Sequence, residues 1–417
     1  MEHNGEYKLS EVLEVAAEAG HVLLENGAEI ARVEETMERI TAYYGAQDRN
    51  FFVLSNGIFT TGANSDAGQY AKVEFIPLKG TQMEKVVEIN AASRAVERGE
   101  YTLDALREKV RQIRNMAAKP AWEQLLGSAF GSAGFCFLFG GGLIDSAASF
   151  VVGLILWAFV LLAGRPGVSK ILVNIVGGAL TTLLCFAFYQ LGFGQNLGNM
   201  MIGSLIPLIP GVPFTNGIRD LANEDYLAGV TRLLDALFVF LAIALGVCVF
   251  FVLQGHITGG VIQLHGSTPD PMTANVPVQT VAALVGTVGF AVIFGAPRKQ
   301  YLAAGVVAAI GWAVYYTIYK YTSLSVVENT FIASVLVSLI SRLTAVIRKC
   351  PTTVFLICGL FPMIPGAGVF WTTYYVTSRQ LPMALSSGLQ AVSITLAIVL
   401  AVVVVSALPR HFKHRKR

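Results

Sequence analysis

The chain has 417 residues, of which 54% are apolar and only 14% are charged. Soluble domains carry about 25% charged residues, so this composition excludes a wholly soluble protein and places much of the chain in a lipid bilayer. The net charge of +3 gives no indication of a nucleic-acid partner, and we expect none. The five cysteines form no C-x-x-C pair, so we expect reduced thiols, no disulfide framework, no metal site and no cofactor.

Residues 1–120 are rich in charge and are predicted to form a small cytoplasmic α+β domain. Residues 10–44 have helical periodicity, which Asn26-Gly27 could interrupt because glycine favours the left-handed conformation after a helix. Two segments alternate like strands, 50–62 and 69–78, and Asn56-Gly57 predicts a tight hairpin or a bulge. Two further helices are expected over 81–98 and 102–117.

Charged side chains are dense at the start of the second half of this helical segment. Glutamate and arginine three or four positions apart are typical of a solvated helix face, which is the interpretation we favour. The same group could bind a substrate or a partner, or serve acid–base catalysis. We see no Ser-His-Asp set, metal-spaced His/Cys set or phosphate-binding loop, and therefore do not expect an enzyme. The residues that carry this motif are Gly27, Glu29, Arg32, Glu34 and Glu35.

The predicted membrane part contains an internal duplication. When the chain is shifted by 155 residues, Trp157 lies over Trp312, Asn174 lies over Asn329, and LIPLIPG at 205–211 lies over LFPMIPG at 360–366. Composition alone would match valine and leucine, but not a lone tryptophan and asparagine in register. We therefore predict two copies of a five-helix unit, the first with helices near 125–143, 146–163, 170–190, 197–213 and 228–254.

Five is an odd number of crossings, so the second copy is predicted to be inverted relative to the first. The positive-inside rule supports this orientation. With the head in the cytoplasm, the inside loops contain Arg165, Lys170, Arg219, Arg298, Lys299, Arg348, Lys349 and the tail RHFKHRKR, whereas the outside loops contain Lys320 and Arg379. We thus expect a mainly α protein with ten transmembrane helices in the cell membrane and both termini in the cytoplasm. The predicted segments are 1–120, 121–255, 256–275 (an extracytoplasmic loop), 276–408 and 409–417 (a basic tail).

Each copy carries two prolines and a glycine in its fourth helix, where they should break the helix. Inverted repeats with discontinuous helices are typical of secondary transporters, whose substrate sites lie on the broken segments. Alternatively, the prolines only kink the helices for packing. We predict that the substrate site includes both breaks, at Pro207, Pro210, Gly211, Pro362, Pro365 and Gly366.

Other polar residues at membrane depth are further candidates, because such residues are costly and usually functional. The predicted substrate-binding set is completed by Asn174, Asn329, Ser334, Ser338 and Arg342, and Asp235 is a candidate proton carrier. Simpler interpretations remain open. The asparagines could be interhelical glue, Arg342 could reach the inner interface, and Asp235 could pair with Arg232.

The segment LLENGAEIARVEETMERITAYYG, the two I-P-G helices and the ten-crossing layout resemble the threonine/serine exporter family over essentially the whole chain. In some relatives this material is split over two subunits associated with succinate export, which would correspond to residues 1–256 and 277–417 here. The resemblance implies efflux of small hydrophilic metabolites, driven by the proton gradient.

The leading hypothesis is thus a secondary exporter of threonine, serine or a similar small metabolite, with a dicarboxylate such as succinate as the alternative substrate. Hypotheses of other classes are a passive channel gated by the head and a membrane-anchored sensor or enzyme. A homo-oligomer is a further hypothesis, because glycines on the first helix of each repeat permit close packing within or between chains. These glycines are Gly127, Gly131, Gly134, Gly286 and Gly289.

Overall fold

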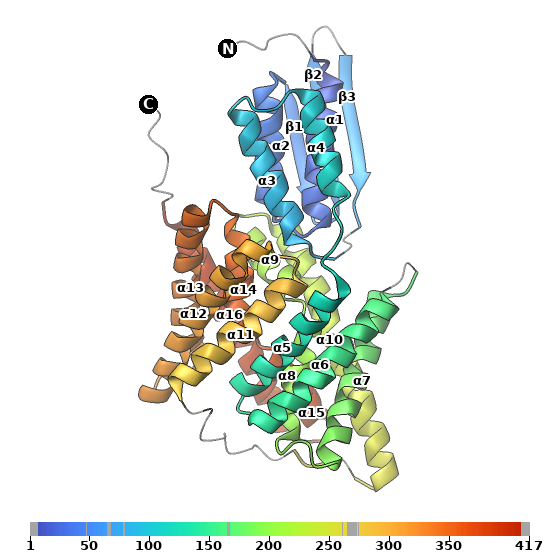
Figure 1. The fold of residues 1–417 in the computed structure, drawn as a ribbon, viewed down its shortest axis with the longest axis vertical. Helices are drawn as coiled ribbons and strands as arrows, with labels where there is room; N and C mark the ends of the chain where they lie inside the picture. Colours follow the sequence, from blue (N-terminus) through green and yellow to red (C-terminus); the bar gives the residue numbers. More distant parts are fainter. Residues whose placement is uncertain are drawn as a thin grey trace.

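A computed structural model describes residues 7–46, 48–64, 68–77, 80–164, 167–260, 262–264, 273 and 275–409. It contains a small head that stands on a larger bundle of helices (Figure 1). The predicted extracytoplasmic loop, 256–275, and the predicted basic tail, 409–417, are described only in part. Residues 261, 265–272, 274 and 410–417 lie outside the described residues.

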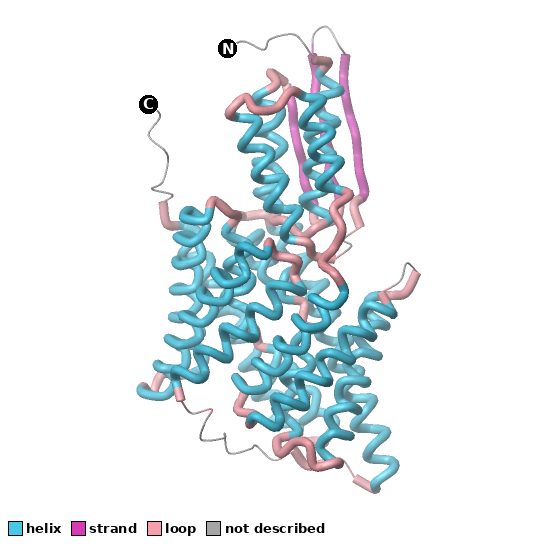
Figure 2. Tube along the Cα trace, in the orientation of Figure 1, coloured by secondary structure: helices cyan, strands magenta, loops and turns pink. Residues whose placement is uncertain are grey.

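The head combines four helices with one sheet, as the sequence predicts (Figure 2). The sheet is an antiparallel meander in the order β1-β2-β3, and its strands run along the long axis of the molecule. The turn at Ser55-Asn56 joins β1 to β2, so Asn56-Gly57 marks a hairpin. The elements are α1 (Leu9–Glu25), α2 (Ile30–Tyr43), β1 (Arg49–Leu54), β2 (Gly57–Asn64), β3 (Gly68–Phe75), α3 (Met83–Glu97) and α4 (Leu103–Arg114).

The two faces of the sheet differ in what covers them. The inner face packs on α1, and Ile58 is buried there within the apolar core of the head. On the outer face Phe52, Phe59 and Val73 form one cross-strand row, and all three are exposed, as is Phe75.

The membrane part repeats its helices at the predicted offset. The bounds of α5 and α11, of α8 and α14, and of α9 and α15 each differ by 155 residues at both ends. The first unit contains α5 (Ala121–Leu138), α6 (Leu143–Ala163), α7 (Lys170–Gln190), α8 (Leu197–Leu205), α9 (Gly211–Ala222) and α10 (Tyr226–Thr258). The second contains α11 (Val276–Ile293), α12 (Tyr301–Tyr321), α13 (Val326–Arg348), α14 (Thr352–Leu360), α15 (Gly366–Thr377) and α16 (Leu381–Ala407).

The number of helices that are long and apolar enough to span a membrane is smaller than the ten predicted. Within the described parts of the chain, eight helices are long and apolar enough to cross a membrane. A ninth is obtained if α8 with its following turn and α9, which meet at 65°, form one span. The predicted first span, α5, is outside this set. The predicted fourth helix was also too short, because α9 continues to Ala222 instead of ending near residue 213.

The first helices of the two units pack directly on each other. A Cβ atom at Gly127 would lie 2.8 Å from the carbonyl oxygen of Gly289, and one at Gly134 would lie 2.7 Å from Cα of Gly286. Because the later residue of α5 meets the earlier residue of α11, the two helices run in opposite directions. The glycine contacts therefore lie within one chain, and they let the two backbones approach closely.

Gly134→Ala should lower the stability of the protein, because its new methyl group would overlap the backbone of Gly286. Overpacking of this kind costs about 1–3 kcal/mol. The control is Gly388→Ala in α16, where the nearest atom lies 3.6 Å away and helix propensity should give a small gain. Thermal unfolding of the detergent-solubilised protein measures both, and equal midpoints for the two variants would contradict the close helix contact.

Candidate functional site

Each unit contains a broken helix with the same backbone path. After α8 the chain forms a short 3-10 turn (Ile206–Leu208), becomes extended at Ile209 with ψ of 130°, and starts α9 at Gly211. The second unit repeats this path with a 3-10 turn at Phe361–Met363 and ψ of 132° at Ile364. Proline has no backbone N–H to donate, so the paired prolines explain why both helices stop here. The predicted breaks are confirmed.

The two breaks pack against each other in the centre of the bundle. A Cβ atom at Gly211 would lie 2.5 Å from the ring of Phe361, and one at Gly366 would lie 2.2 Å from the side chain of Ile209. Glycine is needed at both positions because each break fills the space beside the other. The six predicted break residues are all buried. The structure therefore brings the two halves of the predicted site together.

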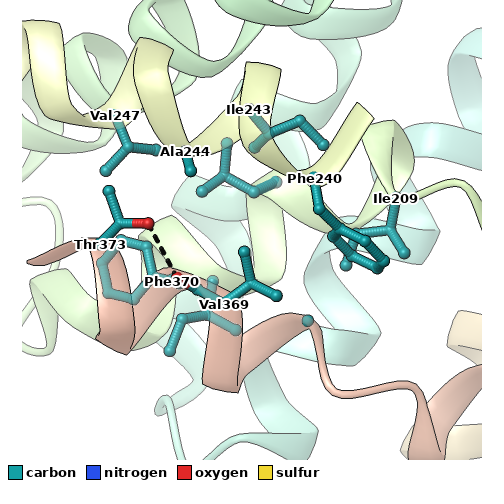
Figure 3. Close-up of a pocket in the computed structure, with 11 residues that line it drawn as sticks. Ile209, Phe240, Ile243, Ala244, Val247, Val369, Phe370 and Thr373 are labelled. Carbon is teal, nitrogen blue, oxygen red and sulfur yellow. Dashed lines mark hydrogen bonds between the residues drawn. The ribbon is translucent and has the colours of Figure 1, made fainter. Parts of the chain in front are cut away.

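A pocket lies between the two breaks and α10 (Figure 3). It encloses about 350 Å³, including the space at its mouth, and its walls include Ile209, Gly366, Phe240 and Ile243. Its one hydroxyl, that of Thr373, donates a hydrogen bond of 2.9 Å to the carbonyl of Val369 in its own helix. No charged residue lines this pocket among the described residues. In this conformation the junction of the breaks is thus closed by apolar side chains.

A polar stripe on α13 runs beside the second broken helix. The Ser334 hydroxyl lies 3.5 Å from the sulfur of Met363 at the break, and the Ser341 oxygen would lie 3.8 Å from a Cβ atom on Gly359 of α14. Neither amide atom of the buried Asn329 has a protein hydrogen-bond partner within the described chain, nor do the Ser338 and Ser341 hydroxyls. Buried polar groups normally have hydrogen-bond partners, so the amide of Asn329 and these hydroxyls could bind a polar ligand or water. The sequence pattern at 334 and 338 omitted Ser341.

Two other predicted polar residues, Asn174 and Arg342, donate hydrogen bonds to backbone carbonyls. The Asn174 amide donates 2.9 Å to the Lys170 carbonyl of its own helix, so it differs from Asn329. Arg342 donates to the carbonyls of Ser406 and Leu408 at the end of α16, which favours the interface interpretation over the substrate site.

Asp235 stays a predicted proton carrier. It is 44% exposed and lies 3.6 Å from the Lys170 ammonium. The alternative pairing with Arg232 is wrong, because that guanidinium binds Asp220 instead.

Glu29 fastens the head to both units of the membrane part. Its carboxylate is 3% exposed and forms ion pairs with Arg32, at 3.0 Å, and with Arg219 of α9. The Thr353 hydroxyl of α14 accepts from Arg219 and donates to Glu29. Burial raises the pKa of the Glu29 carboxyl, but the two arginines and the hydrogen bonds outweigh it and lower the pKa to about 2. The carboxylate therefore stays charged at physiological pH.

A second buried pair lies beside the first. Asp220 is fully buried, pairs with Arg232 at 2.6 Å, and accepts 3.1 Å from the backbone N–H of Ile30, so it caps the start of α2. Arg232 also donates to the Ala28 carbonyl at 2.8 Å. The Asn216 amide donates 2.6 Å to the carbonyl of Gly27, which has a φ of +86° that favours glycine. The sequence placed this end of α9 in a loop, so it missed Asp220 and Asn216.

The predicted charge motif thus divides between two environments. A purely solvated face is wrong for Glu29 and Arg32, because both are held at the junction with the membrane part and Arg32 also donates to Asn90 at 3.0 Å. It is right for Glu35, which is 48% exposed and pairs with Arg39. Glu34 is half-buried, and burial together with the nearby Asp225 carboxylate raises its pKa.

The start of α3 docks on the membrane part in a different way. The backbone N–H groups of Met83 and Glu84 donate to the carbonyls of Phe294 and Gly295 at the end of α11, at 3.1 and 2.8 Å. Free N–H groups at the start of one helix thereby satisfy free carbonyls at the end of another. Two helix starts, those of α2 and α3, therefore hold the head in place above the breaks.

The fold and the site define a multi-pass membrane protein with two helix breaks at its centre and a soluble head docked over them. Two family models match the chain, "Putative threonine/serine exporter" over residues 14–254 and "Threonine/Serine exporter, ThrE" over residues 279–408. The chain therefore belongs to the threonine/serine exporter family, a family of membrane transporters.

Individual relatives agree with the family. The chain is 23% identical over 384 residues to the "Threonine/serine exporter" of Corynebacterium glutamicum, which covers 90% of this chain and 78% of that protein. It is 22% identical over 396 residues to the "Probable threonine/serine exporter" of Mycobacterium tuberculosis, covering 93% and 74%. The "Probable succinate transporter subunit YjjP" of Klebsiella aerogenes is 24% identical over 56% of this chain and 90% of its own length. No solved structure matches the chain.

Glu29→Gln should release the head from the membrane part, because Arg219 would stay buried without its carboxylate. Breaking a buried ion pair in this way costs about 3–5 kcal/mol. The control is Glu35→Gln on the exposed side of the same helix, where an ion pair contributes about 0–1 kcal/mol. Hydrogen exchange of the backbone N–H groups of Ile30, Met83 and Glu84, which bond to the membrane part in the docked head, reports release. Equal exchange in both variants would refute the docking role of Glu29.

The contribution of Glu29 to head docking, measured as the difference between the original chain and Glu29→Gln, should not change between about pH 5 and pH 8, in contrast to a histidine-based switch. The folded-state pKa of Glu29 lies below its ordinary value of 4.5. Its contribution is therefore fully present above pH 4.5 and is lost only as the pH falls toward 2. The same exchange measurement across this range tests the sign, and loosening between neutral pH and about pH 5.5 would assign docking to another titrating group.

Proposed function

We propose that this protein is a secondary active exporter of small amino acids, such as threonine and serine, across the cytoplasmic membrane. The proton gradient is the proposed driving force, and both termini are proposed to lie in the cytoplasm. Family membership supports amino-acid export. The observation that carries a carrier mechanism is the pair of equivalent helix breaks that pack on each other, because discontinuous helices from two repeats form the sites of secondary transporters.

The proposed arrangement is ten crossings in two inverted repeats. Its support is the opposite direction of α5 and α11, which occupy equivalent places in the two units. A second contact pair agrees with it. Arg219 of α9 meets Thr353 of α14 below the head, and the equivalent positions 374 and 198 lie in α15 and α8, where Trp371 of α15 contacts Gly198. The charged junction would then face the cytoplasm and the aromatic junction the outside.

Substrate would pass between the breaks when they separate. The apolar walls of the pocket suit the methyl group of threonine, and the Thr373 oxygen can accept a hydrogen bond from the hydroxyl of either substrate. The α13 stripe offers unsatisfied amide and hydroxyl groups to a polar substrate at another point of its path. From Asn329 to Ser341 this stripe covers about 18 Å along the helix, a large part of the hydrocarbon thickness. Proton coupling is less well supported, because the predicted carrier Asp235 is half-exposed and paired with Lys170.

Two alternatives define what the test must separate. A dicarboxylate such as succinate would use the same fold and mechanism, and the YjjP relatives favour it weakly. A passive channel or a sensor built on the head would need no moving breaks, and it would show no saturable exchange.

Counterflow in proteoliposomes tests the proposal. Vesicles loaded with unlabelled threonine or serine should accumulate the labelled compound transiently, whereas vesicles loaded with succinate should not, and a pH gradient should change the size of the overshoot. Pro210→Ala with Pro365→Ala should reduce the rate by about tenfold or more, because continuous helices would no longer present the breaks. Pro382→Ala at the start of α16 is the matched control, since proline at that position does not interrupt a helix.

Each result decides between the candidates. An overshoot with threonine or serine, sensitive to the break variants, supports the amino-acid exporter. An overshoot with succinate alone moves the substrate class to dicarboxylates. Uptake without any overshoot contradicts a carrier and favours a channel. An overshoot whose size does not change with the pH gradient would refute proton coupling but not amino-acid export.

A further inference from the structure

A second pocket lies at the seam between the head and the membrane part, separate from the apolar pocket at the breaks. Glu25 and Thr81 line it from the head, and Lys170, Val212, Asn216 and Arg232 line it from the membrane part. It encloses about 550 Å³, including its open mouth. Neither part of the protein forms it alone, so the pocket exists only while the head is docked.

The charged side chains around this pocket have both signs and differ in how exposed they are. Arg232 is 3% exposed and is held in place by Asp220 and by the Ala28 carbonyl. Lys170 is 64% exposed and lies at the rim, within 3.6 Å of Asp235. Glu25 is a buried carboxylate on the head side. Two cationic side chains, each with an aspartate partner, therefore line this pocket together with the Glu25 carboxylate.

The floor of the pocket leads to the first helix break. Val212 lies in the first turn of α9, immediately after Gly211, where the positive end of a helix dipole favours an anionic group. Asn216, one turn further along, is 1% exposed. Its amide nitrogen donates to Gly27, whereas its oxygen has no protein partner within the described chain. An ammonium group would satisfy this acceptor.

We propose that the seam pocket binds a small zwitterion from the cytoplasm, an amino acid whose carboxylate lies toward Lys170, Arg232 and the start of α9. Its ammonium group lies toward Glu25 and the Asn216 oxygen. This inference deepens the proposed function and rests on it for the identity of the amino acid. Because the ligand contacts both parts of the protein, it stabilises the docked head and is held directly beside the first break.

The Asn216 oxygen also disfavours a dicarboxylate at this pocket. A carboxylate in the place of the ammonium group would have no hydrogen to donate to that oxygen. The seam pocket should therefore select amino acids over dicarboxylates, whichever of them the breaks can pass.

Hydrogen exchange of the full chain in nanodiscs, with and without L-threonine, L-serine or succinate, tests this proposal. Threonine should protect the peptides that contain residues 25–30 and 211–217. Lys170→Ala and Glu25→Gln should each raise the concentration needed for half protection at least tenfold. The matched controls are Lys299→Ala and Glu14→Gln, which remove exposed charges away from the pocket and should leave this concentration unchanged.

The outcomes separate this inference from the proposed function. The zwitterion site is overturned if neither pocket variant changes the threonine concentration needed for half protection. It is also overturned if succinate protects the same peptides equally well. No protection by threonine, in a preparation that still exchanges threonine by counterflow, overturns the site and leaves the exporter intact. No protection and no counterflow contradict both.

Discussion

The structure depends on one constraint: a broken backbone at membrane depth must be covered by protein, because lipid cannot hydrogen-bond to it. Here each break covers the other. Gly211 and Gly366 leave room for Phe361 and Ile209, and the two short 3-10 turns are buried, the first beside α5 and the second beside α11. Two equivalent breaks can meet in this way only if their units face each other, which is consistent with the antiparallel contact between α5 and α11.

The head is coupled to the same centre by buried charge. Glu29 contacts Arg219 after the first break and Thr353 before the second, so one carboxylate touches both broken helices. A buried carboxylate that loses its cationic partners is costly, and any separation of α9 from α14 must therefore disturb the head. In the proposed mechanism this linkage lets the docked head respond when the breaks separate, and a ligand in the seam pocket would bias the same movement.

Much of this arrangement could be predicted from the sequence, because the duplication preserves residues that composition cannot match by chance. The breaks, the repeated helix bounds and the α+β head follow from prolines, glycines and periodicity. The docking network did not follow. Glu29 and Arg32 have the spacing of an ordinary solvated helix face, and only the fold shows that α9 extends to Ala222 and brings Arg219 and Asp220 beneath them. Similarly, Arg342 and Asp235 are polar residues in apolar helices, and sequence alone could not show that they lie near the ends and the outer surface of the bundle.

The central claim is that two units of opposite orientation place their breaks together. The most direct measurement is the labelling of two introduced cysteines at equivalent exposed positions, Ile144→Cys and Lys299→Cys, in a variant that lacks the partly exposed Cys248. A membrane-impermeant maleimide is applied to intact cells and to inverted vesicles. The account predicts that position 144 reacts only from outside and position 299 only from the cytoplasm. Labelling of both positions from the same side would contradict inverted repeats and the carrier mechanism built on them.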